Sequence, residues 1–144
     1  MSTPVTFAEI LARDGRLVYT IRGSSMKPML LQDRDLVVIH PAGGRLKKLD
    51  VALYRRGKDH VLHRVIRVLE HGYLIRGDNT YADEIVPEED VVGVLTASTH
   101  KNRQYSTDSR AYRCYARLWT GAYPVRRVLV RWRRAALKRL HTAR

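Results

Sequence analysis

The sequence predicts a mainly β protein, in which a small antiparallel body follows a short helix and precedes a basic helical segment. Six short apolar or alternating runs, separated by turn residues, predict strands over most of the first 100 residues. Beyond them, helical spacing and many arginines replace the strand pattern. A hydrophobic content of 44% in 144 residues is sufficient for one domain with a core.

The net charge of +13 is distributed unevenly along the chain. Residues 1–100 contain 14 Lys and Arg against 13 Asp and Glu, whereas residues 101–144 contain 13 Lys and Arg and one acid, Asp108. This asymmetry indicates two functional pieces. We expect a β domain over residues 1–97, a polar linker over 98–109 and a basic amphipathic helical tail over 110–144.

The elements can be placed in order. A short helix over Pro4–Arg13 is expected to have Thr3 as its N-cap and to end at Asp14-Gly15. Strands are expected at 17–22, 36–39, 51–54, 61–69, 73–76 and 91–96. The second strand is continuously apolar, which indicates burial on both faces. Helices are expected over 110–122 and 125–141, with Pro124 starting the second.

The turn after the first strand is the first candidate for chemistry. It contains Gly23, Ser24, Ser25 and Pro28. A serine held in such a tight turn can expose its hydroxyl and leave its backbone N–H free, two properties that a nucleophilic serine needs. A turn without a catalytic role explains the same residues, because Gly, Ser and Pro mark turns generally.

His63 is the second candidate. Strand alternation puts it on the face of Val61 and Val65, where it is either a satisfied, half-buried histidine or a general base that titrates near neutrality. His60 is expected on the opposite face, so the two histidines are not expected to share a metal ion. The sequence has one cysteine, Cys114, and no Cys-x-x-Cys spacing, and it predicts neither metal nor cofactor.

Two carboxylates follow in the loop after residue 76. Asp78 stands in a Gly-Asp-Asn turn, where its side chain can bind loop amides. Asp83 lies past the turn, where a carboxylate could orient an imidazole and stabilise its charged form.

Five blocks of sequence occur in a particular order. They are Ser24–Pro28, Asp33–Val38, Lys48–Tyr54, Leu62–Ile66 and Arg76–Asn79, followed by Val92–Val94. Together they resemble the motifs of the serine peptidase clan that contains type I signal peptidases and self-cleaving SOS-type repressors. The resemblance covers roughly residues 16–96 and implies a coiled antiparallel β peptidase body.

The resemblance also implies roles. Ser25 would attack, His63 would be the base and later the acid, and Asp83 would orient His63, with Asp78 as the alternative. Most bacterial members have a lysine where His63 stands, so the chain is most similar to the Ser-His branch found in the endoplasmic reticulum and in archaea.

The oxyanion donors expected in this chain are the backbone N–H of Ser25 and, as a second candidate, the hydroxyl of Ser24, because the chain departs from the family here. The family often has a serine two residues before the nucleophile, and this chain has Gly23 there. Loss of one donor lowers a rate by about 10²–10³ where the donor matters.

Two functions follow as hypotheses. The first is a serine endopeptidase of signal-peptidase type that cleaves an extended leader or signal-like segment of a peptide or precursor protein. The alternative is a catalytically weak or inactive peptidase-like domain that binds a membrane surface or nucleic acid through its basic tail. Nucleic acid is the less favoured partner, because no helix-turn-helix or RNA-recognition signature is present.

The tail, residues 110–144, contains Trp119, Trp132 and a basic amphipathic pattern. It is expected either to lie on an anionic bilayer or to pack on the β body or on a second copy. No apolar run reaches 18 residues and residues 1–12 lack a secretory pattern, so we expect a cytoplasmic protein that can contact the inner membrane face. The oligomeric state does not follow from the sequence.

Overall fold

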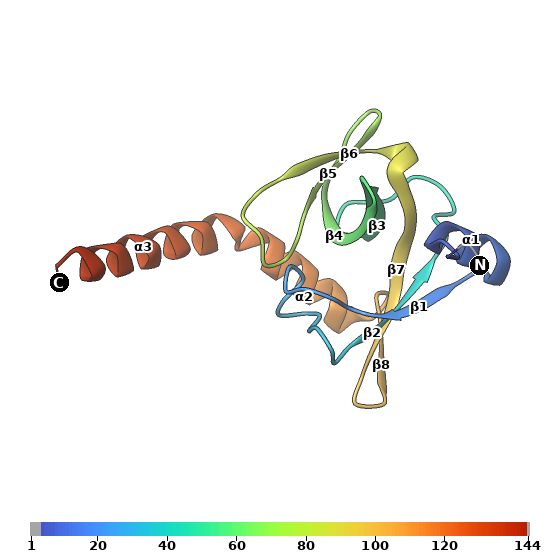
Figure 1. Cartoon of the computed structure of the whole chain (residues 1–144), viewed down its shortest axis with the longest axis horizontal. Helices are drawn as coiled ribbons and strands as arrows, with labels where there is room; N and C mark the ends of the chain where they lie inside the picture. The colour runs from blue at the N-terminus through green and yellow to red at the C-terminus, as the bar shows by residue number, and fades with distance from the viewer. Residues whose placement is uncertain (1–3, 144) are drawn as a thin grey trace.

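A computed structural model describes residues 4–143 and shows one antiparallel sheet of eight strands, with one helix before it and two after it (Figure 1). The elements are α1 (Phe7–Asp14), β1 (Leu17–Thr20), β2 (Leu36–His40), β3 (Val51–Arg56), β4 (Asp59–Val68), β5 (Gly72–Arg76), β6 (Glu84–Pro87), η1 (Glu88–Asp90), β7 (Val91–His100), β8 (Arg103–Ser106), α2 (Arg110–Gly121) and α3 (Tyr123–Thr142). The strand order is β1-β2-β7-β3-β4-β5-β6, with β8 paired to β7. The predicted fold class is confirmed.

Helix α1 begins later than predicted. Thr6 is its N-cap and forms a capping box with Glu9, in which the Thr6 hydroxyl accepts from Glu9 N at 3.2 Å and the Glu9 carboxylate accepts from Thr6 N at 2.8 Å. The predicted cap, Thr3, lies outside the described residues. Gly15, with φ 71°, ends the helix as predicted, because this left-handed conformation costs glycine little.

Strand β2 is buried on one face only, so the prediction of burial on both faces is wrong. Val37 and Ile39 are fully buried, whereas Leu36 is 41% exposed. β2 lies between β1 and β7 in a sheet whose inner face is covered by the core. The run is continuously apolar because residues on its more exposed side, such as Leu36, are apolar as well.

Two strands were not predicted. β6 is a short strand at one edge of the sheet, and β8 forms a hairpin with β7 inside the segment expected to be a linker, 98–109. The turn of this hairpin has positive φ at Lys101 and Asn102, 47° and 63°. Hairpin turns of this hand are favoured because they match the twist of the strands, and asparagine tolerates the conformation.

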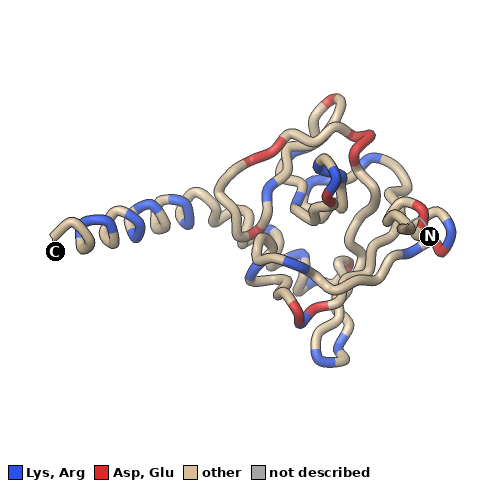
Figure 2. The backbone as a smooth tube through the Cα atoms, in the orientation of Figure 1, with Lys and Arg blue, Asp and Glu red and all other residues tan. Residues whose placement is uncertain are grey.

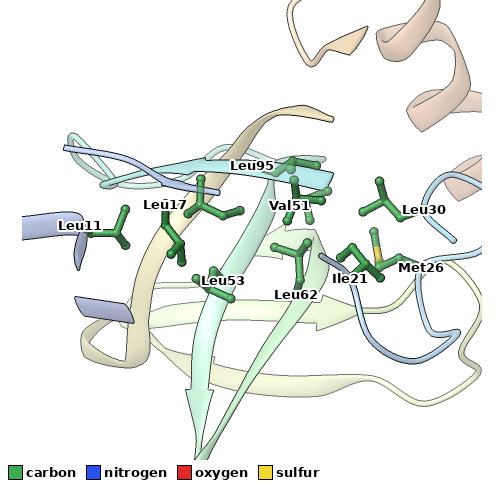
Figure 3. Close-up of a cluster of buried hydrophobic side chains, with 11 residues drawn as sticks. Leu11, Leu17, Ile21, Met26, Leu30, Val51, Leu53, Leu62 and Leu95 are labelled. Carbon is green, nitrogen blue, oxygen red and sulfur yellow. The ribbon is translucent and has the colours of Figure 1, made fainter. Parts of the chain in front are cut away.

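The core lies between the curled sheet, α1 and the loop that follows β1. Its larger cluster contains Leu11 from α1, strand residues such as Val51, Leu53 and Leu62, and Ile21, Met26 and Leu30 from that loop (Figure 3). Ile21 before the serine is 5% exposed, and Met26 and Leu30 after it are 3% and 0% exposed. The loop that carries Ser25 is therefore fixed on both sides of the serine by buried apolar side chains.

The two C-terminal helices differ in their surroundings. α2 lies against the β body and buries Ala116, while α3 extends away from it (Figure 1). Both helices were predicted, and Pro124 stands in the first turn of α3 as expected. No helix within residues 4–143 combines the length and apolar character needed to cross a bilayer.

Candidate active site

The loop between β1 and β2 holds Ser25 in a half-buried position. Gly23 begins the turn with φ 80°, and its N–H donates to Gln32 Oε1 at 2.9 Å. Leu30 N donates to Met26 O at 3.0 Å, which closes the turn on the other side. The serine is thus held by a tight turn whose ends are anchored in the core.

A second loop, 77–80, binds the serine loop directly. Asn79 N donates to Ser25 O at 2.8 Å, and Asn79 Nδ2 donates to Ser24 O at 3.1 Å. Within the described residues 4–143, no hydrogen bond uses the N–H of Ser25. A free backbone N–H on the residue that bears the nucleophile is what an oxyanion donor requires.

Gly77 is where the serine loop and the histidine strand meet. A Cβ added to Gly77 would lie 2.7 Å from Ser25 O, 3.0 Å from His63 Nε2 and 2.9 Å from Thr80 Cγ2. Since the serine carbonyl and the imidazole nitrogen lie so near one point, the two residues are close neighbours. Any side chain at this position would separate them.

Ser25 and His63 line one cavity of about 1210 Å³, together with residues of β1, the β3–β4 hairpin tip and the segment 82–84. In the part of the chain that the structure describes, no hydrogen bond joins the Ser25 hydroxyl to the imidazole. Such contacts are often long in free enzymes and shorten when substrate binds. The structure therefore brings together the two residues that the sequence singles out, and their chemical roles stay a prediction.

The other side of the His63 ring meets Tyr54. His63 is buried, and its Nδ1 lies 3.2 Å from the Tyr54 hydroxyl. Tyr54 donates its one hydroxyl proton to Glu84 Oε2 at 2.8 Å, so its oxygen is left to accept from Nδ1–H. This assigns the tautomer in which Nε2, the nitrogen near Ser25, carries a lone pair, as a general base requires.

The surroundings keep His63 neutral. Burial, and then the Arg56 guanidinium, lower the pKa of His63 to about 4, against the opposing effect of Glu84 and Asp78. Arg56 also forms an ion pair with Glu84 at 2.5 Å, and this hydrogen-bonded pairing holds the pKa of Glu84 below its usual range. At neutral pH the imidazole is therefore an unprotonated base beside a charged, tightly paired carboxylate.

Neither carboxylate considered from the sequence bonds to His63 within the described residues. Asp83 lines the cavity, and its carboxylate accepts from Arg76 Nε at 2.6 Å. Asp78 is bound to Arg64. The predicted orienting role of Asp83, with Asp78 as alternative, has no contact to support it here, and Tyr54 occupies that place.

Sequence reasoning missed Tyr54 and Glu84. In the β3–β4 hairpin Ala52 is opposite His63, so Tyr54, two residues on, is the diagonal neighbour of His63 on the same face. Counting residues outward from the predicted hairpin tip gives this pairing, so the sequence contained a signal that could have placed Tyr54 beside His63. Glu84 comes from β6, whose pairing with β5 has no comparable local signal.

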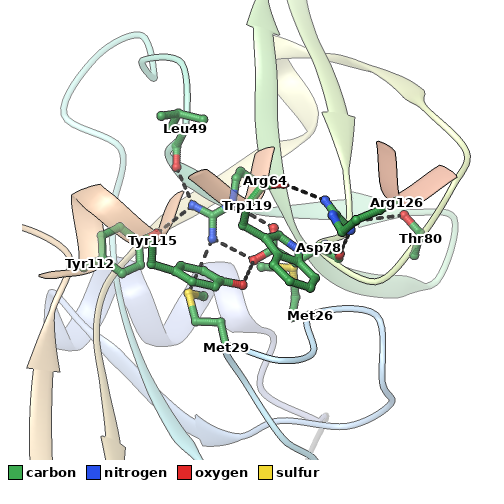
Figure 4. Close-up of polar contacts among 11 residues, drawn as sticks. Met26, Met29, Leu49, Arg64, Asp78, Thr80, Tyr112, Tyr115, Trp119 and Arg126 are labelled. Carbon is green, nitrogen blue, oxygen red and sulfur yellow. Dashed lines mark hydrogen bonds and ion pairs between the residues drawn. The ribbon is translucent and has the colours of Figure 1, made fainter. Parts of the chain in front are cut away.

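Asp78 and Arg64 form a buried ion pair on the far side of β4 (Figure 4). Two hydrogen bonds of 2.8 and 2.9 Å join them, and Arg64 is fully buried. Arg64 also donates to Leu49 O at 2.9 Å and to Tyr112 Oη at 3.0 Å. Leu49 has φ 78°, a left-handed conformation that is strained for leucine and that turns its carbonyl to Arg64.

The C-terminal helices complete this cluster. From α2, Tyr115 Oη donates to Asp78 Oδ2 and Trp119 Nε1 to Asp78 O, both at 2.8 Å. From α3, Arg126 donates to Asp78 O at 3.1 Å and to Trp119 O at 2.8 Å. Asp78 therefore links the loop 77–80, which binds the serine loop, to α2 and α3.

Other cavity residues bear on alternatives raised by the sequence. His60 and His63, expected on opposite faces, both line the cavity, with His60 against the ring of Phe7. Among residues 4–143 no group of three or more His, Cys, Asp or Glu could hold a metal ion.

Comparison with known proteins adds one match. The family model described as Peptidase S24-like matches residues 3–96, well over half of the chain. The match includes Ser25, His63 and the loop 77–80, and it ends before β8, α2 and α3. No curated protein matches the chain.

The buried ion pair predicts a large stability effect. Asp78→Asn leaves the buried charge of Arg64 without its counter-charge, and we expect it to lower the free energy of unfolding by about 3–5 kcal/mol. Tyr115→Phe removes one hydrogen bond to the carboxylate and should cost about 1.5–3 kcal/mol. Asp83→Asn removes the partner of Arg76 in a pair whose carboxylate is 38% exposed and therefore screened by water, and we expect a smaller loss than for Asp78→Asn. Urea unfolding measures all three, and equal losses for Asp78→Asn and Asp83→Asn would contradict the assignment.

Proposed function

The chain belongs to the Peptidase S24-like family, and on that premise we propose that it is a serine endopeptidase of signal-peptidase type, with Ser25 as nucleophile and His63 as general base. The observation that carries the proposal is the contact at Gly77, where the backbone of Ser25 and Nε2 of His63 both come within 3.0 Å of a single added atom. A serine hydroxyl and a neutral imidazole at the wall of one cavity are the nucleophile and the base that acyl transfer by a serine enzyme requires.

The proposed mechanism uses these groups in order. His63 Nε2 takes the hydroxyl proton as Ser25 Oγ attacks the scissile carbonyl and forms the new C–O bond. The N–H of Ser25, with the Ser24 hydroxyl as second candidate, donates to the oxyanion. The imidazolium then gives its proton to the leaving amine as the C–N bond breaks, and a water activated by the same imidazole hydrolyses the acyl-enzyme.

Tyr54 and Glu84 support the base in this proposal. Tyr54 accepts from Nδ1–H and so holds the ring in the tautomer that presents Nε2 to Ser25. When the imidazolium forms, the negative charge of Glu84, one hydrogen bond further on, stabilises it. Arg56 limits this effect by pairing with Glu84.

The substrate of the proposed enzyme is an extended segment. β1 and β6 are the terminal strands of the main sheet order. Residues 19–22, at the end of β1, and residues 82–84, at the start of β6, both line the cavity. An exposed strand edge binds a peptide by adding it as a further strand. A preference for small residues before the scissile bond is implied only by the family resemblance, and the cytoplasmic location of the protein stays a prediction from the sequence.

Labelling with a serine-directed acylating probe tests the nucleophile. We expect the wild-type chain to be modified at Ser25, and Ser25→Ala to show no label. His63→Ala should react about 10²–10⁴ times more slowly, because the hydroxyl proton has no acceptor. The matched controls, His60→Ala in the same cavity and Ser106→Ala on β8, should react like the wild type. Wild type that stays unlabelled would favour the alternative, an inactive peptidase-like binding domain.

The pH dependence of that reaction tests the base. Because its pKa is lowered to about 4, His63 stays neutral well below pH 6.5, the ordinary value, and the rate should be flat from pH 7 to 5 before it falls. Arg56→Gln removes a cation that lowers this pKa, so its acid limb should move toward higher pH. Far-UV circular dichroism at each pH checks that the fold persists. A wild-type midpoint at or above pH 6.5 would contradict the lowered pKa of His63, and an acid limb that His63→Ala leaves unchanged would contradict its role as the base.

A set of variants distinguishes the group that supports His63. Tyr54→Phe removes the acceptor for Nδ1–H, and we expect the labelling rate to fall about 10–100-fold with the fold retained. Glu84→Gln should have an effect of the same sign. Asp83→Asn should leave the rate unchanged. The reverse result, a loss in Asp83→Asn alone, would assign the support to Asp83 as the resemblance implied.

A further inference from the structure

Helix α3 exposes an apolar stripe. Val125, Leu129, Trp132, Ala136 and Leu140 follow one another at spacings of three or four residues, which places them on one side of a helix. Val125, Leu129, Trp132 and Leu140 are 63%, 58%, 70% and 67% exposed. Packing on the β body, one of the alternatives left open by the sequence, describes α2 and the Arg126 contact of α3, but not this stripe.

The same helix carries charge of one sign only. Seven basic residues and no acid occur in it (Figure 2). The basic residues are Arg126, Arg127, Arg131, Arg133, Arg134, Lys138 and Arg139. Arg127 with Arg131, and Arg134 with Lys138, stand four residues apart, a spacing at which like charges destabilise a helix. Within residues 4–143, the only hydrogen bonds that these seven side chains donate are those of Arg126.

We propose that α3 binds an anionic lipid surface, lying in the plane of the headgroups with its apolar stripe toward the acyl chains. Lipid phosphates would neutralise the repelling arginines, and the interface would take up the apolar stripe. Trp132, at the centre of the stripe, suits this boundary because its ring is apolar and its N–H needs a polar partner.

Two other occupants fit less well. A second copy that pairs α3 with α3 would bring seven more positive charges and no acid to compensate them. A nucleic acid would pair with the arginines but would leave Trp132 and the leucines of the stripe in water. An anionic membrane is the partner that matches both faces of the helix.

The first turns of α3 connect this surface to the cavity lined by Ser25 and His63. Arg126 in the first turns of α3 donates to Asp78 O, and the neighbouring Asn79 holds the serine loop. Lipid binding would therefore place the cavity at a fixed position relative to the membrane. This consequence rests on the proposed peptidase function, whereas the lipid binding itself does not.

Co-sedimentation of the full chain with vesicles tests the proposal. We expect binding to phosphatidylcholine vesicles that contain phosphatidylglycerol, and little binding to phosphatidylcholine alone. Trp132→Ser and Leu129→Ser should each weaken binding about tenfold or more. Arg131→Gln should weaken it about fivefold, and added salt should do the same progressively.

Matched controls distinguish binding through the stripe from nonspecific hydrophobic or electrostatic binding. Leu118→Ser removes an apolar side chain that is 69% exposed on α2, and Arg103→Gln removes a charge from the β7–β8 hairpin. Both should bind like the wild type. Ser25→Ala should also bind fully, so failure of the peptidase proposal and failure of lipid binding are distinguishable.

Three results would overturn the proposal. One is equal binding to both kinds of vesicle. Another is phosphatidylglycerol binding that Trp132→Ser and Leu129→Ser leave unchanged, which would mean attraction by charge alone. The third is a dimer in sedimentation velocity that Leu129→Ser dissociates while vesicle binding is absent, which would assign the stripe to a second copy.

Discussion

The buried ion pair between Arg64 and Asp78 is the constraint on which the site depends. Removing two charges from water is costly, and the pair is stable only because further hydrogen bonds satisfy both partners. Those bonds come from Leu49 and from α2, whereas α3 binds the backbone carbonyl of Asp78 and not its carboxylate. Arg64 follows His63 in the chain, and Asp78 follows Gly77. The ion pair therefore fixes the histidine strand and the serine-binding loop with respect to each other.

Adjacent residues of strand β4 belong to two separate polar clusters. Arg64 points to the helix side, where it is fully buried and paired, and His63 points to the cavity, where Tyr54, Glu84 and Arg56 surround it. Alternation along a strand makes this division possible, because adjacent residues face opposite sides. The two polar systems thus lie back to back, and the neutral imidazole on one side coexists with a permanent buried charge on the other.

The sequence was informative wherever the signal was local. Strand positions, the α2 and α3 bounds and the placing of Ser25 with His63 at one cavity could be predicted from runs, turn residues and motif order. Contacts between segments far apart in sequence could not. β6 brings Glu84 to Tyr54, and α2 brings Tyr115 to Asp78, through packing that no local pattern encodes. The hairpin at Lys101-Asn102 was missed because its residues are polar on both faces.

The absence of a side chain at position 77 has a consequence for related sequences. The backbone there does not adopt a positive φ, so glycine is required for space rather than for conformation. Alanine at the corresponding place in another chain would meet the carbonyl of the residue equivalent to Ser25 and the imidazole equivalent to His63 at once. Such a chain could retain the serine and the histidine and still have a disrupted site, which makes this glycine a marker for distinguishing active from inactive members of the family.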